Sequence, residues 1–363
     1  MNTRKVFRAI GKVLFVILLI VVLLLLISSI IYHIKLNNVE KQLKEAGYYA
    51  PLSVGDHSLN LYSCGNENGQ HTIIAMAGWG DGETNIGWRQ MTAEIEKDNR
   101  LIFLDRPGYG LSDDTAQNMI PENVVEEYRA ALKCSGIEAP YLLMGHSMGG
   151  LYATYWVSKY PDEIEAVVFV DGECCYEIPE EERIGGGFTT AIMPVIEKLG
   201  FAPLVIESQY GKFLQSIPED KREQALYMMC RTIGSSAAVS EMNNDERNID
   251  FVWKQMVTTE MPKLYISATI AYHTKEDFIN DGIAAASLVG IWTEPSLENA
   301  DDDAIYEEAL KLMETTRREK AEPYIEKLGN CKLVELPGDH VIFLDKPDEC
   351  GKIIKEFLDG LDS

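Results

Sequence analysis

Apolar residues form one long run near the start of the chain and shorter runs later. From Val13 to Ile34 the sequence VLFVILLIVVLLLLISSIIYHI has 22 residues without a Lys, Arg, Asp or Glu. A helix of this length crosses the hydrocarbon core of a bilayer. A cleaved signal peptide would have a shorter apolar segment followed by small residues at a cleavage site. We therefore expect a basic tail at residues 1–12, a transmembrane anchor at 13–34 and a stalk at 35–50.

The charged residues beside the anchor predict its orientation. Four basic residues and no acidic residue precede it, whereas the basic residues after it are diluted by Glu40 and Glu45. The more positive flank of a membrane span stays in the cytoplasm. We therefore expect a single-pass protein of the cell membrane, held in the bilayer by its anchor, with residues 51–363 outside the cell.

Beyond the anchor, apolar runs of strand length alternate with longer stretches of helical periodicity. Strands that are apolar throughout and alternate with helices indicate a mostly parallel sheet covered by helices on both faces. An antiparallel edge hairpin is expected around Leu59–Cys64. The other expected strands are Thr72–Ala77, Leu101–Asp105, Tyr141–Met144, Ala166–Asp171, Leu264–Ser267 and Lys332–Leu336, and the expected helices are 85–98, 122–134, 147–160, 305–327 and 348–361.

One long gap breaks this alternation. Between Gly172 and Met261 the chain has no strong strand pattern, but it contains helical patches at Ala191–Leu199 and Glu219–Thr232. A crossover between neighbouring strands needs far fewer residues. We therefore expect residues 51–363 to form one α/β domain with a helical lid inserted at about residues 172–261.

Charge and cysteine usage narrow the class of protein. The net charge is −24, and because residues 1–45 carry seven basic and two acidic residues, the rest of the chain carries −29. Such an acidic surface repels nucleic acid. The seven cysteines lack the paired spacings of a zinc site, and their odd number argues against a complete disulfide framework.

The strongest chemical pattern is Gly145-His146-Ser147-Met148-Gly149-Gly150, which follows an apolar strand and opens a helix. A G-x-S-x-G sequence in this setting places the serine on a tight strand-to-helix turn, exposed as a nucleophile. The backbone N–H of Met148 then points at the reacting centre, and the glycine-rich turn Ala77–Gly82 offers the N–H of Trp79 as a second donor for an oxyanion. We expect Ser147 to be the nucleophile and Trp79 and Met148 to form the oxyanion hole.

The general base is expected among six histidines. His340 follows the last expected strand, and loops at the carboxyl ends of parallel strands carry the sites of α/β sheets. His146 lies beside the nucleophile and is expected to face away from it. The sequence therefore predicts His340 as the base.

Four segments in this order, AGWGDG (77–82), LDRPGYGLSD (104–113), GHSMGG (145–150) and GDHVIFLDKP (338–347), resemble the α/β-hydrolase superfamily. The resemblance covers roughly Leu59 to Leu361 and implies an α/β-hydrolase fold with a serine hydrolase mechanism. The chain departs from the common pattern at Ala77, where many members carry a histidine. Neither a metal nor an organic cofactor is required by this mechanism.

The acid of the triad has two main candidates. Many family members place it a few residues beyond the strand that here reads KLYISA, where this chain has no carboxylate until Glu276 and Asp277. A different subset places it at the end of the preceding strand, where Asp171 stands. Asp171 is favoured and Asp277 is the alternative; Glu173, Asp281 or no acid at all are the remaining options.

The function that follows is hydrolysis of an ester or similar acyl bond in a small-molecule substrate. Apolar lid residues could line an acyl pocket; they are Phe188, Ile192, Phe201, Leu204, Val205 and Phe213. An exopeptidase or amidase is an alternative, with carboxylates such as Glu180, Glu181, Glu182 and Glu241 pairing with a substrate ammonium. A membrane-anchored binding protein that kept the fold is the non-catalytic alternative.

Overall fold

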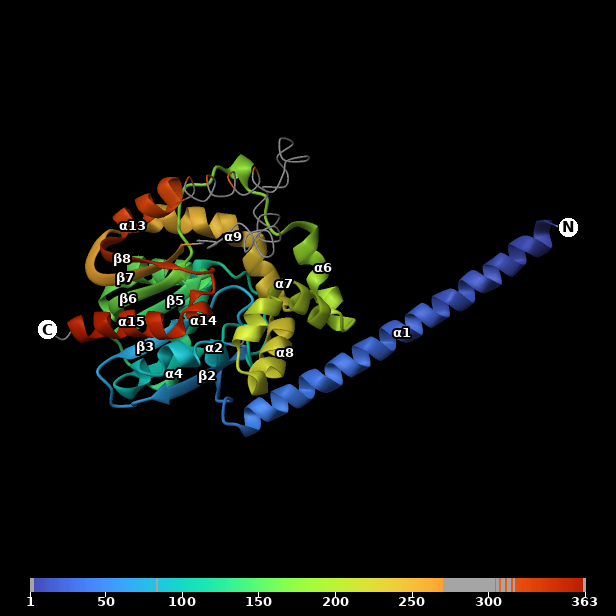
Figure 1. The fold of residues 1–363 in the computed structure, drawn as a ribbon, viewed down its shortest axis with the longest axis horizontal. Helices are drawn as coiled ribbons and strands as arrows, with labels where there is room; N and C mark the ends of the chain where they lie inside the picture. The colour runs from blue at the N-terminus through green and yellow to red at the C-terminus, as the bar shows by residue number, and fades with distance from the viewer. Residues whose placement is uncertain are drawn as a thin grey trace.

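The structure is a computed structural model, described for residues 3–82, 84–269 and 317–361 and for residues 304, 307, 311 and 315. A single long helix, α1 (Thr3–Glu45), leads away from a body of sheet and helices (Figure 1). It spans the expected tail, the anchor and most of the stalk without a break. By length and composition this helix could cross a membrane.

The body is built around a sheet that is mostly parallel. Among the described residues it has eight strands in the order β1-β2-β4-β3-β5-β6-β7-β8. The β1–β2 and β2–β4 pairs are antiparallel, and every pair from β4–β3 onward is parallel, as the strand pattern predicted. The strands are β1 (Pro51–Val54), β2 (His57–Gly65), β3 (Thr72–Met76), β4 (Arg100–Leu104), β5 (Tyr141–Ser147), β6 (Ile164–Gly172), β7 (Thr259–Thr269) and β8 (Gly329–Pro337).

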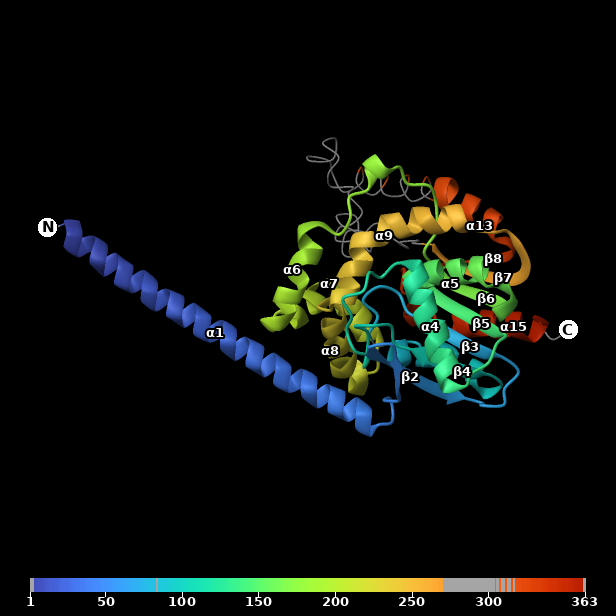
Figure 2. The same ribbon diagram turned by 180° about the vertical axis from the view of Figure 1, so that it is seen from behind.

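Helices cover both faces of this sheet. Alternate residues of the central strands enter two cores, so that Leu142 packs with the group containing Trp88 and Ile354, and Leu143 packs with the group containing Trp156. Figures 1 and 2 show α15 (Pro347–Leu361) on one face, and α4 (Pro121–Ser135) and α5 (Met148–Lys159) on the other. The remaining short elements are α2 (Thr84–Gly87), α3 (Arg89–Thr92), α13 (Glu322–Leu328), α14 (Ile342–Asp345), a π-helical turn at Arg317–Ala321 and 3₁₀ turns at Ile95–Lys97, Pro161–Glu163, Glu180–Glu182 and Glu219–Lys221.

Two expected elements differ from the observed ones. The helix expected over 85–98 is broken after Gly87 into short pieces, in keeping with the weak tendency of glycine to continue a helix. The strand expected to be buried over 332–336 is largely half-buried or exposed, because β8 is the edge of the sheet. The helix expected over 305–327 lies only partly within the described residues.

The long segment between β6 and β7 is helical. It contains α6 (Gly187–Lys198), α7 (Ala202–Ser216), α8 (Arg222–Ile233) and α9 (Ser236–Gln255). Ser235 is the N-cap residue of α9, and its hydroxyl accepts a hydrogen bond from the Ala238 amide, which satisfies one free donor of the first turn. Figures 1 and 2 show α6, α7 and α8 between the sheet and α1.

Candidate active site

The backbone turns sharply at Ser147, where β5 ends and α5 begins. Ser147 has φ 47° and ψ −126°, a conformation that side-chain-bearing residues rarely adopt. The turn brings the first residues of α5 against β3, and a Cβ at Gly149 would overlap the carbonyl oxygen of Met76. Only glycine fits at that position. The Ser147 hydroxyl therefore stands at a helix N-terminus, beside amides that have no partner within the helix.

The loop Ala77–Gly82, after β3, lies directly against this turn. A Cβ at Gly78 would be 3.1 Å from the Cβ of Ser147. The amides of Gly78, Gly80 and Gly82 have partners, namely the Asp81 carboxylate, the Tyr109 hydroxyl and the Gly80 carbonyl. Within the described residues the Trp79 amide has no hydrogen-bond partner. It is the amide of this loop that the sequence predicted as an oxyanion donor.

His340 and Asp171 meet at the same edge of the sheet. The Nδ1 atom of His340 is 2.6 Å from Oδ2 of Asp171. The other carboxylate oxygen of Asp171 accepts a hydrogen bond of 2.8 Å from the Ala268 amide on β7. Asp171 also has a positive φ of 46°. Its position at the end of β6, next to Ser147 at the end of β5, aims the carboxylate at the loop after β8.

The surrounding carboxylates change the basicity of His340. Burial lowers the pKa of its imidazole. The hydrogen bond to Asp171 and the charges of Asp171, Glu173 and Asp81 raise this pKa by more than burial lowers it. The net effect is a pKa raised from 6.5 to about 9. Negative charge close to an imidazole favours its protonated form, which is the form a general base reaches during the reaction.

His146, which was expected to face away from the site, lies next to His340. The two ring centroids are 4.7 Å apart, and Nε2 of His146 is 3.0 Å from the backbone oxygen of His340. On its other side Nδ1 of His146 is 3.0 Å from the Asp81 carboxylate, which also accepts from the Gly78 amide. His146 therefore connects the glycine-rich loop to the loop of His340.

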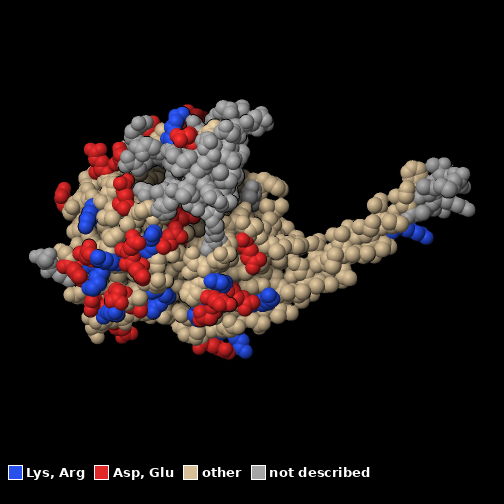
Figure 3. Space-filling view, viewed as in Figure 1, with Lys and Arg blue, Asp and Glu red and all other residues tan. Residues whose placement is uncertain are grey.

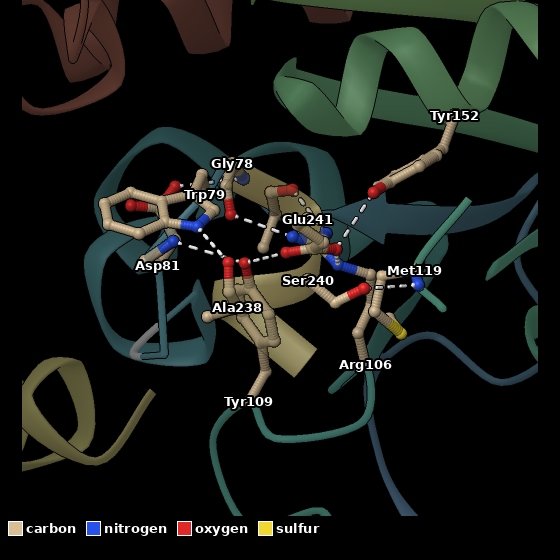
Figure 4. Close-up of polar contacts among 12 residues, drawn as sticks. Gly78, Trp79, Asp81, Arg106, Tyr109, Met119, Tyr152, Ala238, Ser240 and Glu241 are labelled. Carbon is tan, nitrogen blue, oxygen red and sulfur yellow. Dashed lines mark hydrogen bonds and ion pairs between the residues drawn. The ribbon is translucent and has the colours of Figure 1, made fainter. Parts of the chain in front are cut away.

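A buried ion pair between Arg106 and Glu241 supports the same glycine-rich loop (Figure 4). The guanidinium of Arg106 donates to the carbonyl oxygens of Ala77 and Gly78, at 2.6 and 3.1 Å. Its Nε is 2.9 Å from Oε1 of Glu241 on α9, and the side chains of both residues are at most 1% exposed. Tyr152 and Tyr109 donate hydrogen bonds to the Glu241 carboxylate. The Trp79 indole adds a hydrogen bond of 2.9 Å to the Ala238 carbonyl of α9.

These contacts revise several sequence-based expectations. Glu241 is completely buried and paired with Arg106, so its carboxylate does not face a substrate ammonium. Of the apolar residues suggested for an acyl pocket, Phe213 packs in the core, whereas Phe188 and Leu204 are exposed to 80% and 63%. Asp277 and Asp281, considered as triad acids, lie outside the described residues.

Sequence reasoning missed three contributors to this arrangement. Asp81 lies in the glycine-rich loop and Arg106 in the segment LDRPGYG, and both motifs are identified from the sequence without a predicted role for either residue. Glu241 was predicted to face a substrate ammonium in the exopeptidase alternative. Glu241 shares a face of α9 with the apolar residues Ala237, Ala238 and Val252, which are buried. This spacing of apolar residues is the signal that could have indicated that Glu241 is buried.

No group of three or more His, Cys, Asp or Glu suited to a metal ion is found in the described part of the chain. All seven cysteines are free.

Comparison with known proteins supports one family. A family model described as alpha/beta hydrolase fold matches residues 73–223. The uncharacterized protein YbdG of Bacillus subtilis is 27% identical over 348 residues, covering 96% of both chains. A pimeloyl-[acyl-carrier protein] methyl ester esterase of Hamiltonella defensa is 31% identical over 119 residues, which is 33% of this chain and 42% of that one.

Among solved structures, a bacterial membrane phospholipase A superimposes with a TM-score of 0.55 at 16% identity, covering 96% of this chain and 99% of that one. This likeness concerns the fold alone. The matched region 73–223 contains Trp79, Ser147 and Asp171, and it supports hydrolase activity in general. By its sheet, its strand-to-helix turn at Ser147 and these matches, the chain has the α/β-hydrolase fold.

Proposed function

We propose that this chain is a membrane-anchored serine hydrolase that cleaves an ester or similar acyl bond in a small-molecule substrate. One observation carries the proposal. The turn at Ser147 lies at the same edge of the sheet as the His340–Asp171 pair, in which Nδ1 of His340 is 2.6 Å from Oδ2 of Asp171. A nucleophile, a base and a residue that orients the base are the parts that acyl transfer needs.

In the proposed reaction Ser147 loses its proton to Nε2 of His340 as its oxygen attacks the substrate carbonyl. The oxygen of the tetrahedral intermediate is held by the amides of Trp79 and Met148. His340 then protonates the leaving group, and the acyl-enzyme forms on Ser147. Water, activated by the same imidazole, attacks the acyl group and releases the acid, which restores the free serine.

Asp171 is the proposed acid of the triad. Its contact with Nδ1 of His340 leaves Nε2 as the nitrogen that exchanges protons with the serine. The hydrogen bond from Ala268 to the second carboxylate oxygen fixes the carboxylate in this pose. We favour Asp171 over Asp277 for this reason.

Covalent labelling of the full-length chain in detergent with a fluorophosphonate probe tests the proposal. We expect rapid labelling of the wild type, none of Ser147→Ala, and much slower labelling of His340→Gln and Asp171→Asn. Ser158→Ala is a matched control, because Ser158 lies near the other end of α5, where its hydroxyl donates to the Thr154 carbonyl and accepts from the Val257 amide. Labelling that persists in Ser147→Ala, or a folded wild type that does not label, would contradict the proposed mechanism.

The proposed location is the outer face of the cell membrane, with the N-terminus in the cytoplasm. The basic residues that precede the apolar part of α1 support this orientation. A reporter enzyme fused after Ser363 that works only outside the cytoplasm should be active. Activity of a cytoplasm-specific reporter at the same position would reverse the orientation.

A further inference from the structure

The helix α6 presents an apolar face to solvent. Phe188 and Val195 are exposed to 80% and 52%, and Ala191 between them is also exposed. Residues at these spacings lie on one side of a helix. The acidic residue of α6, Glu197, is buried on the opposite side. Leu204, at the start of α7, continues this exposed apolar surface at 63%.

The C-terminal end of α6 contacts α1. The hydroxyl of Ser29 donates a hydrogen bond of 2.6 Å to the carbonyl of Lys198. A Cβ at Gly200 would be 2.7 Å from the Ser28 carbonyl and 2.8 Å from the Tyr32 Cβ, so the two backbones are in close contact. The turn between α6 and α7 therefore lies at the level of Ser28 and Ser29 along α1.

That level corresponds to the edge of a bilayer. Lys12 is the last charged residue before the apolar run of α1, and Lys35 is the first after it. Ser28 stands sixteen residues beyond Lys12, roughly 25 Å along a helix, while the hydrocarbon core is about 30 Å thick. Ser28 and the α6–α7 turn thus reach the membrane boundary on the Lys35 side.

The charge distribution fits the same boundary. Figure 3 shows the shaft of α1 as an almost uncharged surface, whereas acidic and basic side chains are spread over the body. The exposed face of α6, formed by Phe188, Ala191 and Val195, has no carboxylate, although the chain as a whole has a net charge of −24. An apolar face without acids is the kind of surface that enters the interfacial region of a membrane.

From these observations we infer that the face formed by Phe188, Ala191, Val195 and Leu204 docks onto the bilayer that α1 spans. The inference rests on the proposed role of α1 as a membrane anchor and is independent of the catalytic chemistry. This apolar face contacts the lipid at the membrane boundary. The helices α6 and α7 therefore form the side of the protein that faces the membrane. Acyl substrates dissolved in that bilayer would meet the protein at this side.

Site-specific photo-crosslinking in proteoliposomes of phosphatidylcholine and phosphatidylglycerol tests the docking. The full-length chain carries p-benzoylphenylalanine in place of Phe188, of Val195 or of Leu204, and lipid adducts are measured by mass spectrometry. The same substitution at Leu19, in the apolar part of α1, reports on the anchor. A matched control is Val257, which is 56% exposed but lies at the amino end of β7, away from the active-site edge.

We expect lipid adducts at 188, 195 and 204 in amounts comparable to those at 19, and only background at 257. Adducts at 19 without adducts at 188, 195 and 204 would overturn the docking and leave the anchor intact. Crosslinks from 188 to a second copy of the chain would also overturn it, because the face would then be a dimer contact. Absence of adducts at 19 would refute the anchor, and the docking with it.

Discussion

At the scale of single residues, the site is assembled from two unusual backbone conformations on neighbouring strands. Ser147 and Asp171 are the non-glycine residues with positive φ in the described part of the chain. Such conformations cost about 1–3 kcal/mol each and persist where the surrounding structure enforces them. Here the pairing of β5 with β6 through Ser147 and Gly172 supplies that constraint. The strain sets the directions of the proposed nucleophile and of the proposed acid together.

If His340 is the base, as proposed, its raised pKa predicts the pH dependence of the proposed reaction. A general base works in its neutral form, so a pKa of about 9 leaves most of the imidazole protonated at neutral pH. We expect the rate of fluorophosphonate labelling to rise about fiftyfold between pH 7 and pH 9. Stopped labelling reactions across this range measure the profile.

Asp171→Asn serves as the comparison for that profile. The amide keeps the shape of the side chain but removes the negative charge that raises the pKa of His340. The acidic limb of its profile should therefore move to lower pH, and its maximal rate should fall because the imidazole is held less firmly. A wild-type profile already flat between pH 7 and pH 9 would show that the carboxylates do not control this base.

The close approach of Gly78 to Ser147, the proposed nucleophile, predicts a steric effect. In Gly78→Ala the new Cβ would be 3.1 Å from the Cβ of Ser147 and 2.7 Å from Nδ1 of His146, so the loop must shift. Displaced oxyanion donors should slow labelling by roughly tenfold to a hundredfold. Gly360→Ala, which adds its Cβ to open space, should leave the rate unchanged. Equal rates for both variants would mean that the loop yields without moving the donors.

At the scale of secondary-structure elements, the Arg106–Glu241 pair joins α9 to the glycine-rich loop. In Glu241→Gln the buried guanidinium of Arg106 loses its countercharge. Breaking a buried ion pair costs about 3–5 kcal/mol, because the remaining charge stays in a poorly solvated place. We expect a lower midpoint of urea unfolding together with slower labelling, since the Trp79 loop and α9 lose their common support.

Glu94→Gln is the matched control for that change, because Glu94 pairs with Lys97 on the surface. An exposed pair contributes little, so its removal should leave the unfolding midpoint and the labelling rate unchanged. If Glu241→Gln lowered stability but left labelling at the wild-type rate, the pair would support the fold without positioning the loop.

Much of the fold could be predicted from the sequence, because strands and turns are local features. The apolar runs located each strand except β1, and the motif around Ser147 located the turn between β5 and α5. His340 and Asp171 were predicted because both follow or end strands, where order along the chain implies position at one sheet edge. The choice between Asp171 and Asp277 stayed open, since the reach of a loop residue depends on how its loop folds.

Contacts between distant elements could not be predicted in the same way. Neighbouring residues on a strand point to opposite sides, so His146 was expected to turn away from the site. The loop after β8 passes over that side, and His146 contacts the backbone of His340 there. Glu241 was misinterpreted for a similar reason, because its partner Arg106 lies more than a hundred residues earlier and the pairing depends on where α9 docks.

At the scale of the whole molecule, the helix α1, part of which is the proposed membrane anchor, also belongs to the folded body. Beyond Ser28 one side of the helix is buried at intervals of three or four residues. Two contacts attach α1 to α8. The rings of Tyr32 and Tyr227 stack with their centroids 5.7 Å apart, and Nε of Arg231 is 3.4 Å from Oε1 of Glu40. The buried residues on this side are Tyr32, Leu36, Val39 and Leu43.

This packing predicts that the stability of the α/β body depends on the last turns of α1. A fragment of residues 46–363 loses four buried apolar side chains, each worth about 1.5–3 kcal/mol, relative to a fragment of residues 28–363. In mild detergent its thermal unfolding midpoint should be roughly 10 °C lower. In the longer fragment Leu36→Ala should reproduce part of the loss, whereas Lys41→Ala, on the exposed side of the same helix, should not. Identical midpoints for the two fragments would mean that α1 lies against α8 without stabilising it, and that the body folds independently of its anchor.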